Sequence, residues 1–193
     1  NILTNSKITL IIPSLINQSP VKALIILANN LSLKFDVTVI CFKQDLDLWD
    51  TFSKKIIVLN FYNPNIFKIL NNFNNYFNKN SDTTCFSYGL SSDIICRIFH
   101  SKIDYLISSL RGTLFELYPL KYGFFLGKLL SIFHNFLILK SNLIIVMNNP
   151  SLDYYSKKFK NVIKINNFIN EKDIPLRKNK SVPINDGQVN FIF

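Results

Sequence analysis

Short apolar runs rich in β-branched residues alternate along this sequence with longer runs whose apolar residues recur at helical spacing. Alternating strands and helices predict a parallel sheet, because each helix carries the chain from the end of one strand to the start of the next. The short runs are apolar throughout, which is typical of strands buried on both faces. We therefore expect an α/β fold of the doubly wound type, with a mostly parallel sheet of about seven strands and helices on both faces.

The predicted elements follow one another as in a Rossmann-like domain. Strands are expected at residues 7–13, 36–42, 55–59, 83–87, 103–108, 143–147 and 162–166. Helices are expected at residues 20–33, 65–77, 89–99, 118–140 and 150–159, the first with Ser19 as N-cap and Pro20 as its first residue. We expect one Rossmann-like domain over residues 1–169, an interdomain linker at 170–188 and the start of a truncated second Rossmann-like domain at 189–193.

The net charge of +10 points to an anionic partner, such as nucleic acid, anionic lipid or a phosphorylated ligand. A composition biased toward Lys, Asn and Ile explains the same charge about equally well. The densest basic patch, formed by Lys157, Lys158, Lys160 and Lys164, has no recognised nucleic-acid motif around it. We therefore expect no nucleic-acid partner.

Three cysteines, Cys41, Cys85 and Cys96, lie in apolar runs at spacings that fit no metal motif. Reduced, buried thiols are the expected reading, and they suit the cytoplasm. With only two histidines in the chain, we expect no metal site. The first ten residues lack the basic and long apolar regions of a signal peptide, so a cytoplasmic location is expected.

The sequence lacks the motifs that several enzyme classes require. The loop after the first strand, "SLINQSP", has no glycine, and Lys43 stands where a dinucleotide site needs an acid. The sequence has neither a Walker loop nor a G-x-S-x-G elbow. Two histidines without a positioned acid give no support to a Ser or Cys triad.

The candidate site lies at the carboxyl ends of the strands, where open α/β sheets bind ligands. The cleft residues expected there are Ser14, Asn17, Gln18, Ser19, Tyr88, Gly89, Ser109, Arg111, Glu116 and Asn148. Hydroxyls, amides and one guanidinium suit sugar hydroxyls together with an anionic group. Arg111 fits a phosphate or carboxylate, although a surface pair with Glu116 explains it equally well. Asn148 has a simpler explanation as the cap of the helix that follows.

The predicted helix at residues 118–140 contains the apolar stretch "GFFLGKLLSIFHNFLIL", which is short for a membrane span. Lys128, Ser131 and Asn135 recur at helical spacing beside His134, which makes the helix amphipathic with a wide apolar face. Packing in the core is the favoured reading. The alternative is peripheral contact with an anionic membrane through Tyr118, Lys121, Lys128 and Lys140.

The order of the pieces resembles family-4 retaining glycosyltransferases of the GT-B fold. The resemblance rests on "KITLIIPSL", "CFSYGLSSDIICRIF", "YLISSLRGTLFELYPLKYG" and "NVIKINNFIN", covers about residues 7–170 and continues into "VNFIF". The stretch "SSLRGTLFELYPLKYG" is most similar to enzymes that build bacterial surface polysaccharides.

The resemblance implies the N-terminal, acceptor-side domain of an enzyme that moves a sugar from a nucleotide-sugar donor to a saccharide or lipid-linked saccharide. The products would be capsule, lipopolysaccharide or exopolysaccharide, made at the inner face of the cytoplasmic membrane. The donor would be bound mainly by a second domain, so the chain alone is expected to be inactive, and no cofactor is implied. Arg111 stands where many members carry a histidine, so no catalytic residue is carried over. The alternative is a stand-alone Rossmann-like module that binds an anionic ligand or a protein partner.

Overall fold

The computed structural model describes residues 7–80 and 83–166, which form a sheet of seven parallel strands. The strands are β1 (Lys7–Ile11), β2 (Asp36–Cys41), β3 (Ile57–Asn60), β4 (Thr83–Tyr88), β5 (Tyr105–Leu110), β6 (Leu143–Val146) and β7 (Val162–Lys164). Each lies within about two residues of its predicted position. The expected α/β fold is confirmed, and every strand pair in the described sheet is parallel.

The strand order is β3-β2-β1-β4-β5-β6-β7, so the chain first winds outward from β1 to β3 and then returns to β4 on the other side. The registers Ile11 with Ser87 and Ser87 with Ser108 bring the carboxyl ends of β1, β4 and β5 to one edge. This edge, where the winding reverses between β1 and β4, is where open α/β sheets form their ligand crevice.

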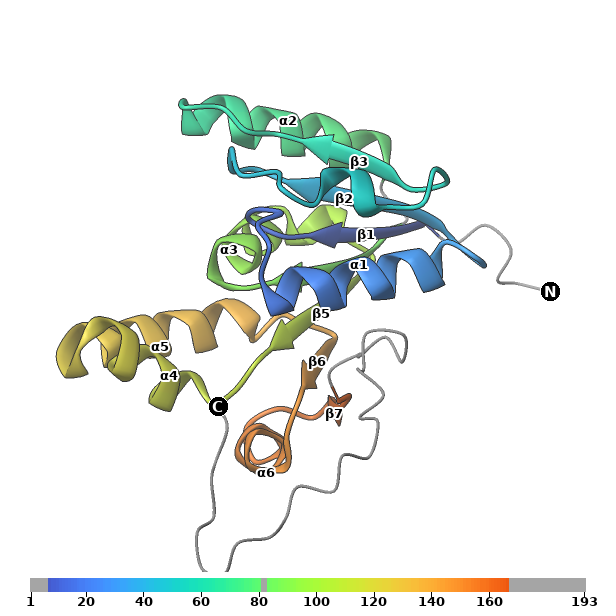
Figure 1. The fold of residues 1–193 in the computed structure, drawn as a ribbon. Coiled ribbons are helices and arrows are strands. Elements are labelled where there is room, and N and C mark those ends of the chain that lie inside the picture. The colour runs from blue at the N-terminus through green and yellow to red at the C-terminus, as the bar shows by residue number, and fades with distance from the viewer. Residues whose placement is uncertain (1–6, 81–82, 167–193) are drawn as a thin grey trace, which may run out of the picture.

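Helices cover both faces of the sheet, as Figure 1 shows for α1 on one face and α2 and α3 on the other. The helices are α1 (Ser19–Leu31), α2 (Ile66–Lys79), α3 (Leu90–Ile98), α4 (Leu114–Tyr122), α5 (Phe124–Ile138) and α6 (Asn149–Ser156). Leu24 of α1 belongs to one buried cluster with Leu10 of β1 and Val39 of β2. Phe73 of α2 belongs to a second cluster with Cys85, on the opposite face.

Two local predictions are wrong. Ser19 is the first residue of α1 and not its cap; the cap position is Gln18, whose side chain makes no capping hydrogen bond among the described residues. The single helix expected at residues 118–140 is a hairpin of two helices, α4 and α5, that meet at Gly123. Gly123 has a φ of +79°, which an L side chain rarely adopts, and the chain reverses there.

The predicted linker at 170–188 and the predicted second domain at 189–193 lie outside the described residues, and the single domain over 1–169 stays a prediction. Within residues 7–80 and 83–166, none of the helices has the length and apolar character needed to cross a membrane.

Candidate functional site

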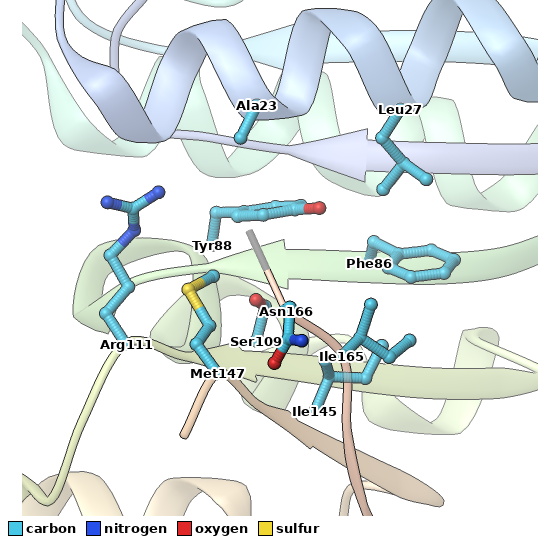
Figure 2. A pocket seen from close by; sticks show the side chains of 10 residues that line it. All are labelled: Ala23, Leu27, Phe86, Tyr88, Ser109, Arg111, Ile145, Met147, Ile165 and Asn166. Atoms are coloured by element: carbon cyan, nitrogen blue, oxygen red, sulfur yellow. The ribbon is translucent and has the colours of Figure 1, made fainter. Parts of the chain in front are cut away.

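A pocket of about 110 Å³ lies between α1 and the carboxyl-terminal halves of β4, β5 and β6. Figure 2 shows Arg111 at one end of the pocket, the Tyr88 ring in the middle and Phe86 at the inner end. The lining residues are Ala23, Leu27, Phe86, Tyr88, Ser109, Arg111, Ile145, Met147, Ile165 and Asn166. The wall is mostly apolar, and its polar groups lie toward the edge of the sheet where the crevice was expected.

Arg111 follows β5 directly and is exposed to solvent at the mouth of the pocket. Partial burial lowers the pKa of its guanidinium, and the neighbouring Tyr88 raises it. Burial also raises the pKa of the Tyr88 phenol. Glu116 accepts a hydrogen bond from the Thr113 hydroxyl, and no Arg111–Glu116 ion pair forms within the described residues. The fork of Arg111 is therefore open to an anionic group in the pocket mouth.

Three of the ten predicted site residues line this pocket together: Tyr88, Ser109 and Arg111. They meet because Tyr88 and Ser109 are register partners at the ends of neighbouring parallel strands. Gly89 follows Tyr88 with a φ of +86° and is the N-cap residue of α3. It does not line the pocket, and its backbone supplies the sharp turn from strand to helix.

The loop after β1 is placed beside the pocket and not in it. Leu15 is fully buried, and its N–H donates to the Asp45 carbonyl at 3.0 Å, which fixes the loop to the connection after β2. Asn17 donates its N–H to Asp47 Oδ2 at 3.4 Å. The predicted residues Ser14, Asn17, Gln18 and Ser19 do not line the pocket, and the last three are exposed. The Asp47 carboxylate beside this loop disfavours a second anion there.

Glu116 and Asn148 also lie outside the pocket lining. The Asn148 side chain accepts a hydrogen bond from the Ser151 N–H at 2.8 Å and caps α6. The simpler explanation for Asn148, as a helix cap, is therefore confirmed. Its role in ligand binding has no support from this geometry.

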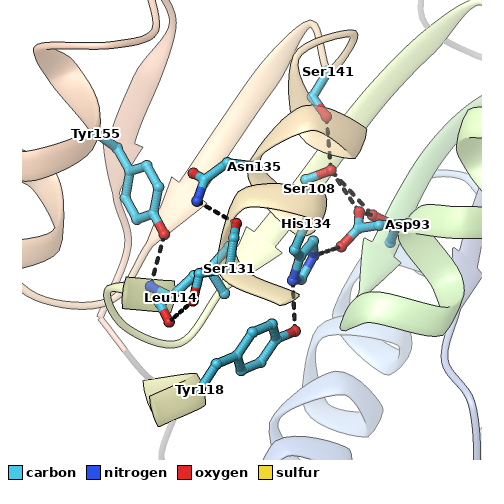
Figure 3. A network of polar contacts seen from close by, with 10 residues as sticks. Asp93, Ser108, Leu114, Tyr118, Ser131, His134, Asn135, Ser141 and Tyr155 are labelled. Atoms are coloured by element: carbon cyan, nitrogen blue, oxygen red, sulfur yellow. Dashed lines mark hydrogen bonds and ion pairs between the residues drawn. The ribbon is translucent and has the colours of Figure 1, made fainter. Parts of the chain in front are cut away.

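Figure 3 shows a buried polar network that the sequence reading missed. His134 Nε2 lies 2.7 Å from Asp93 Oδ2, and His134 Nδ1 lies 2.6 Å from the Tyr118 hydroxyl. The other carboxylate oxygen of Asp93 accepts hydrogen bonds from the hydroxyls of Ser87 and Ser108. Asp93 and His134 are almost completely buried, so both depend on this network for their polar contacts.

This network corrects the expectation that neither histidine has a positioned acid. The arrangement is still not a nucleophile triad, because Ser87 and Ser108 bond to Asp93 and not to the imidazole. In the tautomer whose Nε2–H donates to Asp93, Nδ1 of His134 accepts a hydrogen bond from the Tyr118 hydroxyl. Burial, followed by the Asp93 charge, raises the pKa of Tyr118, which keeps that donor protonated. The polar stripe of Ser131, His134 and Asn135 on an apolar helix was the signal in the sequence.

The described residues contain no cluster of His, Cys, Asp and Glu that could hold a metal ion. All three cysteines are buried and free, and burial raises the pKa of each thiol. These thiols therefore pack as small apolar groups, and they offer no nucleophile.

Solved structures that share this fold include those of the three proteins described next. HepE of Anabaena, solved in complex with UDP and glucose, aligns with a TM-score of 0.64 at 16% identity, over 86% of this chain and 45% of HepE. The lipopolysaccharide outer core galactosyltransferase WaaB, in its apo form, gives 0.56 at 14% identity, over 89% of this chain and 50% of WaaB. A Listeria monocytogenes protein assigned as a UDP-N-acetylglucosamine 2-epimerase aligns with a TM-score of 0.55 at 12% identity, over 80% of this chain and 42% of that protein.

The chain therefore has the fold of one half of GT-B glycosyltransferases, and it spans about half or less of the length of these proteins. No protein-family model matches the sequence, and the curated proteins contain no significant match. At these identities the likeness shows the fold.

Proposed function

We propose that this chain is the acceptor-side domain of a retaining glycosyltransferase that uses a nucleotide sugar. Its acceptor would be a saccharide or lipid-linked saccharide used in bacterial surface polysaccharide. The observation that carries the proposal is the pocket formed by Arg111, Tyr88 and Ser109 at the switch edge of a fold shared with HepE and WaaB. HepE was solved with UDP-glucose, and WaaB is a galactosyltransferase.

The chemistry of the pocket supports this function better than it supports hydrolysis. Arg111 offers a planar fork for a phosphate, of the donor or of a lipid-linked acceptor. The Ser109 hydroxyl and the Tyr88 ring are groups that bind and stack on sugars. Among the described residues that line the pocket there is neither a nucleophile with its base nor a paired set of carboxylates. In this proposal the chain orients one substrate, and a second domain supplies most of the donor contacts.

A stand-alone binding module is the second candidate. It is favoured by the apolar inner part of the pocket, where Phe86, Ile145 and Ile165 would accept a flat or aliphatic group. This candidate needs a ligand that binds without any second domain, at an affinity that a nucleotide sugar does not reach.

Titration of the chain with UDP, UDP-glucose and inorganic phosphate, followed by NMR, tests the proposal. We expect weak binding of UDP and UDP-glucose with shifts near Arg111, and at least about a tenfold loss in Arg111→Gln, because charged hydrogen bonds contribute roughly 1.5–3 kcal/mol. Lys22→Gln, an exposed cation on α1, is the matched control and should bind as the original chain does. Equal binding by Arg111→Gln would contradict the assignment.

Enzyme assays test the division between two domains. The 193-residue chain should release no UDP from UDP-glucose in the presence of lipid-linked saccharide acceptors. Sugar transfer by this chain alone would overturn the proposal that it needs a second domain.

A further inference from the structure

Helix α5 presents its more polar side to the protein and its more apolar side to solvent. The buried residues at its centre are Gly127, Ser131 and His134, spaced along one stripe. Ser131 Oγ donates to the Leu114 carbonyl at 2.6 Å, and His134 bonds to Asp93. A helix at the surface of a protein in water has the opposite pattern.

The outward side of the hairpin is made of large apolar side chains. The exposed large apolar residues of α4, α5 and the residue that follows α5 are Leu117, Leu120, Tyr122, Phe124, Phe125, Leu126, Leu129, Ile132, Phe133, Phe136 and Leu139. Leu120 and Phe125 are each 86% exposed, and Phe124 is 70% exposed. We call this set the hairpin face. A contiguous apolar surface of this kind marks an interaction site, since monomeric soluble proteins rarely expose one.

Lysines are the exposed charges along most of the hairpin, and the one acid in its two helices is Glu116, in the first turn of α4. Between Glu116 and Asp153 the sequence has no Asp or Glu, while Lys121, Lys128 and Lys140 are exposed there. Lys128 Nζ lies 4.1 Å from the centre of the Phe124 ring, and Lys121 Nζ lies 5.2 Å from that of Tyr122. Lysines beside exposed aromatic rings are the arrangement that amphipathic helices use at a membrane surface.

We propose that the hairpin face docks on a membrane surface that contains anionic lipids, with its apolar side chains in the interface and its lysines at the headgroups. This deepens the proposed function and rests on it, because a docked hairpin would bring the candidate site to a lipid-linked acceptor. Figure 1 shows α4 and α5 projecting beyond the carboxyl ends of the strands. Arg111 lies only three residues before the start of α4 at Leu114, so the pocket mouth adjoins the docked hairpin.

A lipid surface fits the hairpin face better than a protein does. Protein interfaces are depleted of lysine at their centre, whereas Lys121 and Lys128 lie against aromatic rings of the hairpin face itself. A second copy of the same face would place like charges opposite each other. Anionic headgroups satisfy the lysines, and acyl chains satisfy the Phe and Leu side chains, in one layer.

Sedimentation of the 193-residue chain with vesicles tests the proposal. The vesicles are phosphatidylcholine alone or phosphatidylcholine with phosphatidylglycerol, in 0.15 M salt and without nucleotide sugar. We expect binding to the mixed vesicles, and a loss of at least about tenfold in Phe125→Ser/Leu129→Ser, because burying a large apolar side chain contributes about 1.5–3 kcal/mol. Phe67→Ser/Ile66→Ser removes two exposed apolar side chains from α2 and should bind as the original chain does.

Lysine variants separate the contribution of charge to vesicle binding from that of apolar contact. Lys121→Gln/Lys128→Gln should lose about 25-fold on the mixed vesicles, since each lysine near an anionic surface contributes about 1 kcal/mol, or about fivefold. Lys22→Gln/Lys68→Gln, which changes exposed lysines on α1 and α2, should reduce the affinity for mixed vesicles by less than half as much as the hairpin variant does, compared as logarithms. All the changed side chains are exposed, so circular dichroism should show the same fold in each variant.

Three results would overturn the docking. These are no sedimentation with mixed vesicles, equal losses in the hairpin variants and their controls, or a dimer in solution that Phe125→Ser/Leu129→Ser abolishes while vesicles bind nothing. The last result would mean that the hairpin face is an interface between two copies of this chain. Binding of UDP-glucose that depends on Arg111, together with absent vesicle binding, would overturn the docking and leave the proposed function standing.

Discussion

The backbone of Gly127 in α5 lies directly against the backbone of Pro119 in α4. A Cβ atom on Gly127 would come within 2.3 Å of the Pro119 nitrogen and 2.4 Å of its Cα atom. Real Cβ atoms do not approach backbone atoms this closely, so only glycine fits at this crossing. The contact holds the two helices of the hairpin together at backbone distance, and it positions the hairpin face.

Gly127→Ala should therefore open the hairpin. In a helix without this contact, the change would stabilise the protein by about 0.8–1 kcal/mol, because alanine is the better helix former. Here we expect a loss of at least about 2 kcal/mol in the free energy of unfolding, because backbone atoms cannot yield as side chains do. Urea unfolding of the original chain and of Gly127→Ala measures this difference in the free energy of unfolding.

Gly112→Ala is the matched control for the hairpin. A Cβ atom at Gly112 would meet only the Leu117 side chain, at 3.0 Å, and that half-exposed side chain can move away. The two variants should differ in stability by well over 1 kcal/mol. Equal stability of both would mean that the crossing at Pro119 is not as tight as described.

Asp93→Ala should destabilise the protein by about 3–5 kcal/mol, because it leaves His134 and two serine hydroxyls buried without their partner. Asp153→Ala removes an exposed carboxylate from α6 and should leave the free energy of unfolding nearly unchanged. The double variant Asp93→Ala/His134→Ala should cost less than the sum of its parts, since both changes break one contact. Additive costs in urea unfolding would show that the two side chains act independently.

Ala23→Leu should block the pocket without harming the fold. Ala23 lies on α1 and lines the pocket opposite Tyr88 and Arg111, and leucine is also a good helix former. We expect loss of UDP-glucose shifts in NMR together with an unfolding free energy that is unchanged or higher. Ala28→Leu is a contrasting variant, since Ala28 is fully buried in the core and the larger side chain should destabilise the protein. Retained ligand shifts in Ala23→Leu would place the ligand elsewhere.

Most of the sheet could be predicted from the sequence because β1, β2, β5 and β6 are short runs that are almost entirely buried, whereas β3 and β7 at the two edges are partly exposed. The hairpin could not, because the apolar spacing continues unbroken through Gly123 and the reversal depends on one positive φ. Local sequence also gives no sign of the Gly127–Pro119 crossing, which depends on how two helices meet in space. The sequence favours core packing for the residues of the hairpin face, because large apolar residues are usually buried.

The positions of candidate-site residues could be predicted where they lie at the ends of parallel strands. The prediction was wrong where the conformation of a loop determines whether a residue reaches the pocket. Tyr88, Ser109 and Arg111 converge because they end neighbouring strands. The Ser14–Ser19 loop lies to one side because Leu15 is pulled into the core, which its neighbours in sequence do not reveal. Asp93 and His134 lie 41 residues apart on different helices, so their pairing follows only from the packing of α3 against α5.

Stability should fall as the pH rises from about 8.5 to about 11, in part because of Cys41. Burial raises the pKa of this thiol to about 11, whereas an unfolded cysteine has a pKa near 8.5. Below the lower value both states hold the proton, and the contribution of the thiol is fully present. Above it the unfolded chain ionises first, which favours unfolding until the pH passes the folded value.

Urea unfolding of the original chain and of Cys41→Ala at pH 8 and pH 10.5 measures this contribution. The variant should have a lower free energy of unfolding at pH 8, because Cys41 is fully buried, and a smaller loss between the two pH values. Some loss should remain, since burial also raises the pKa of Cys85, Cys96 and Tyr155. An identical loss in both proteins would mean that the Cys41 thiol ionises as freely in the folded chain as in the unfolded one.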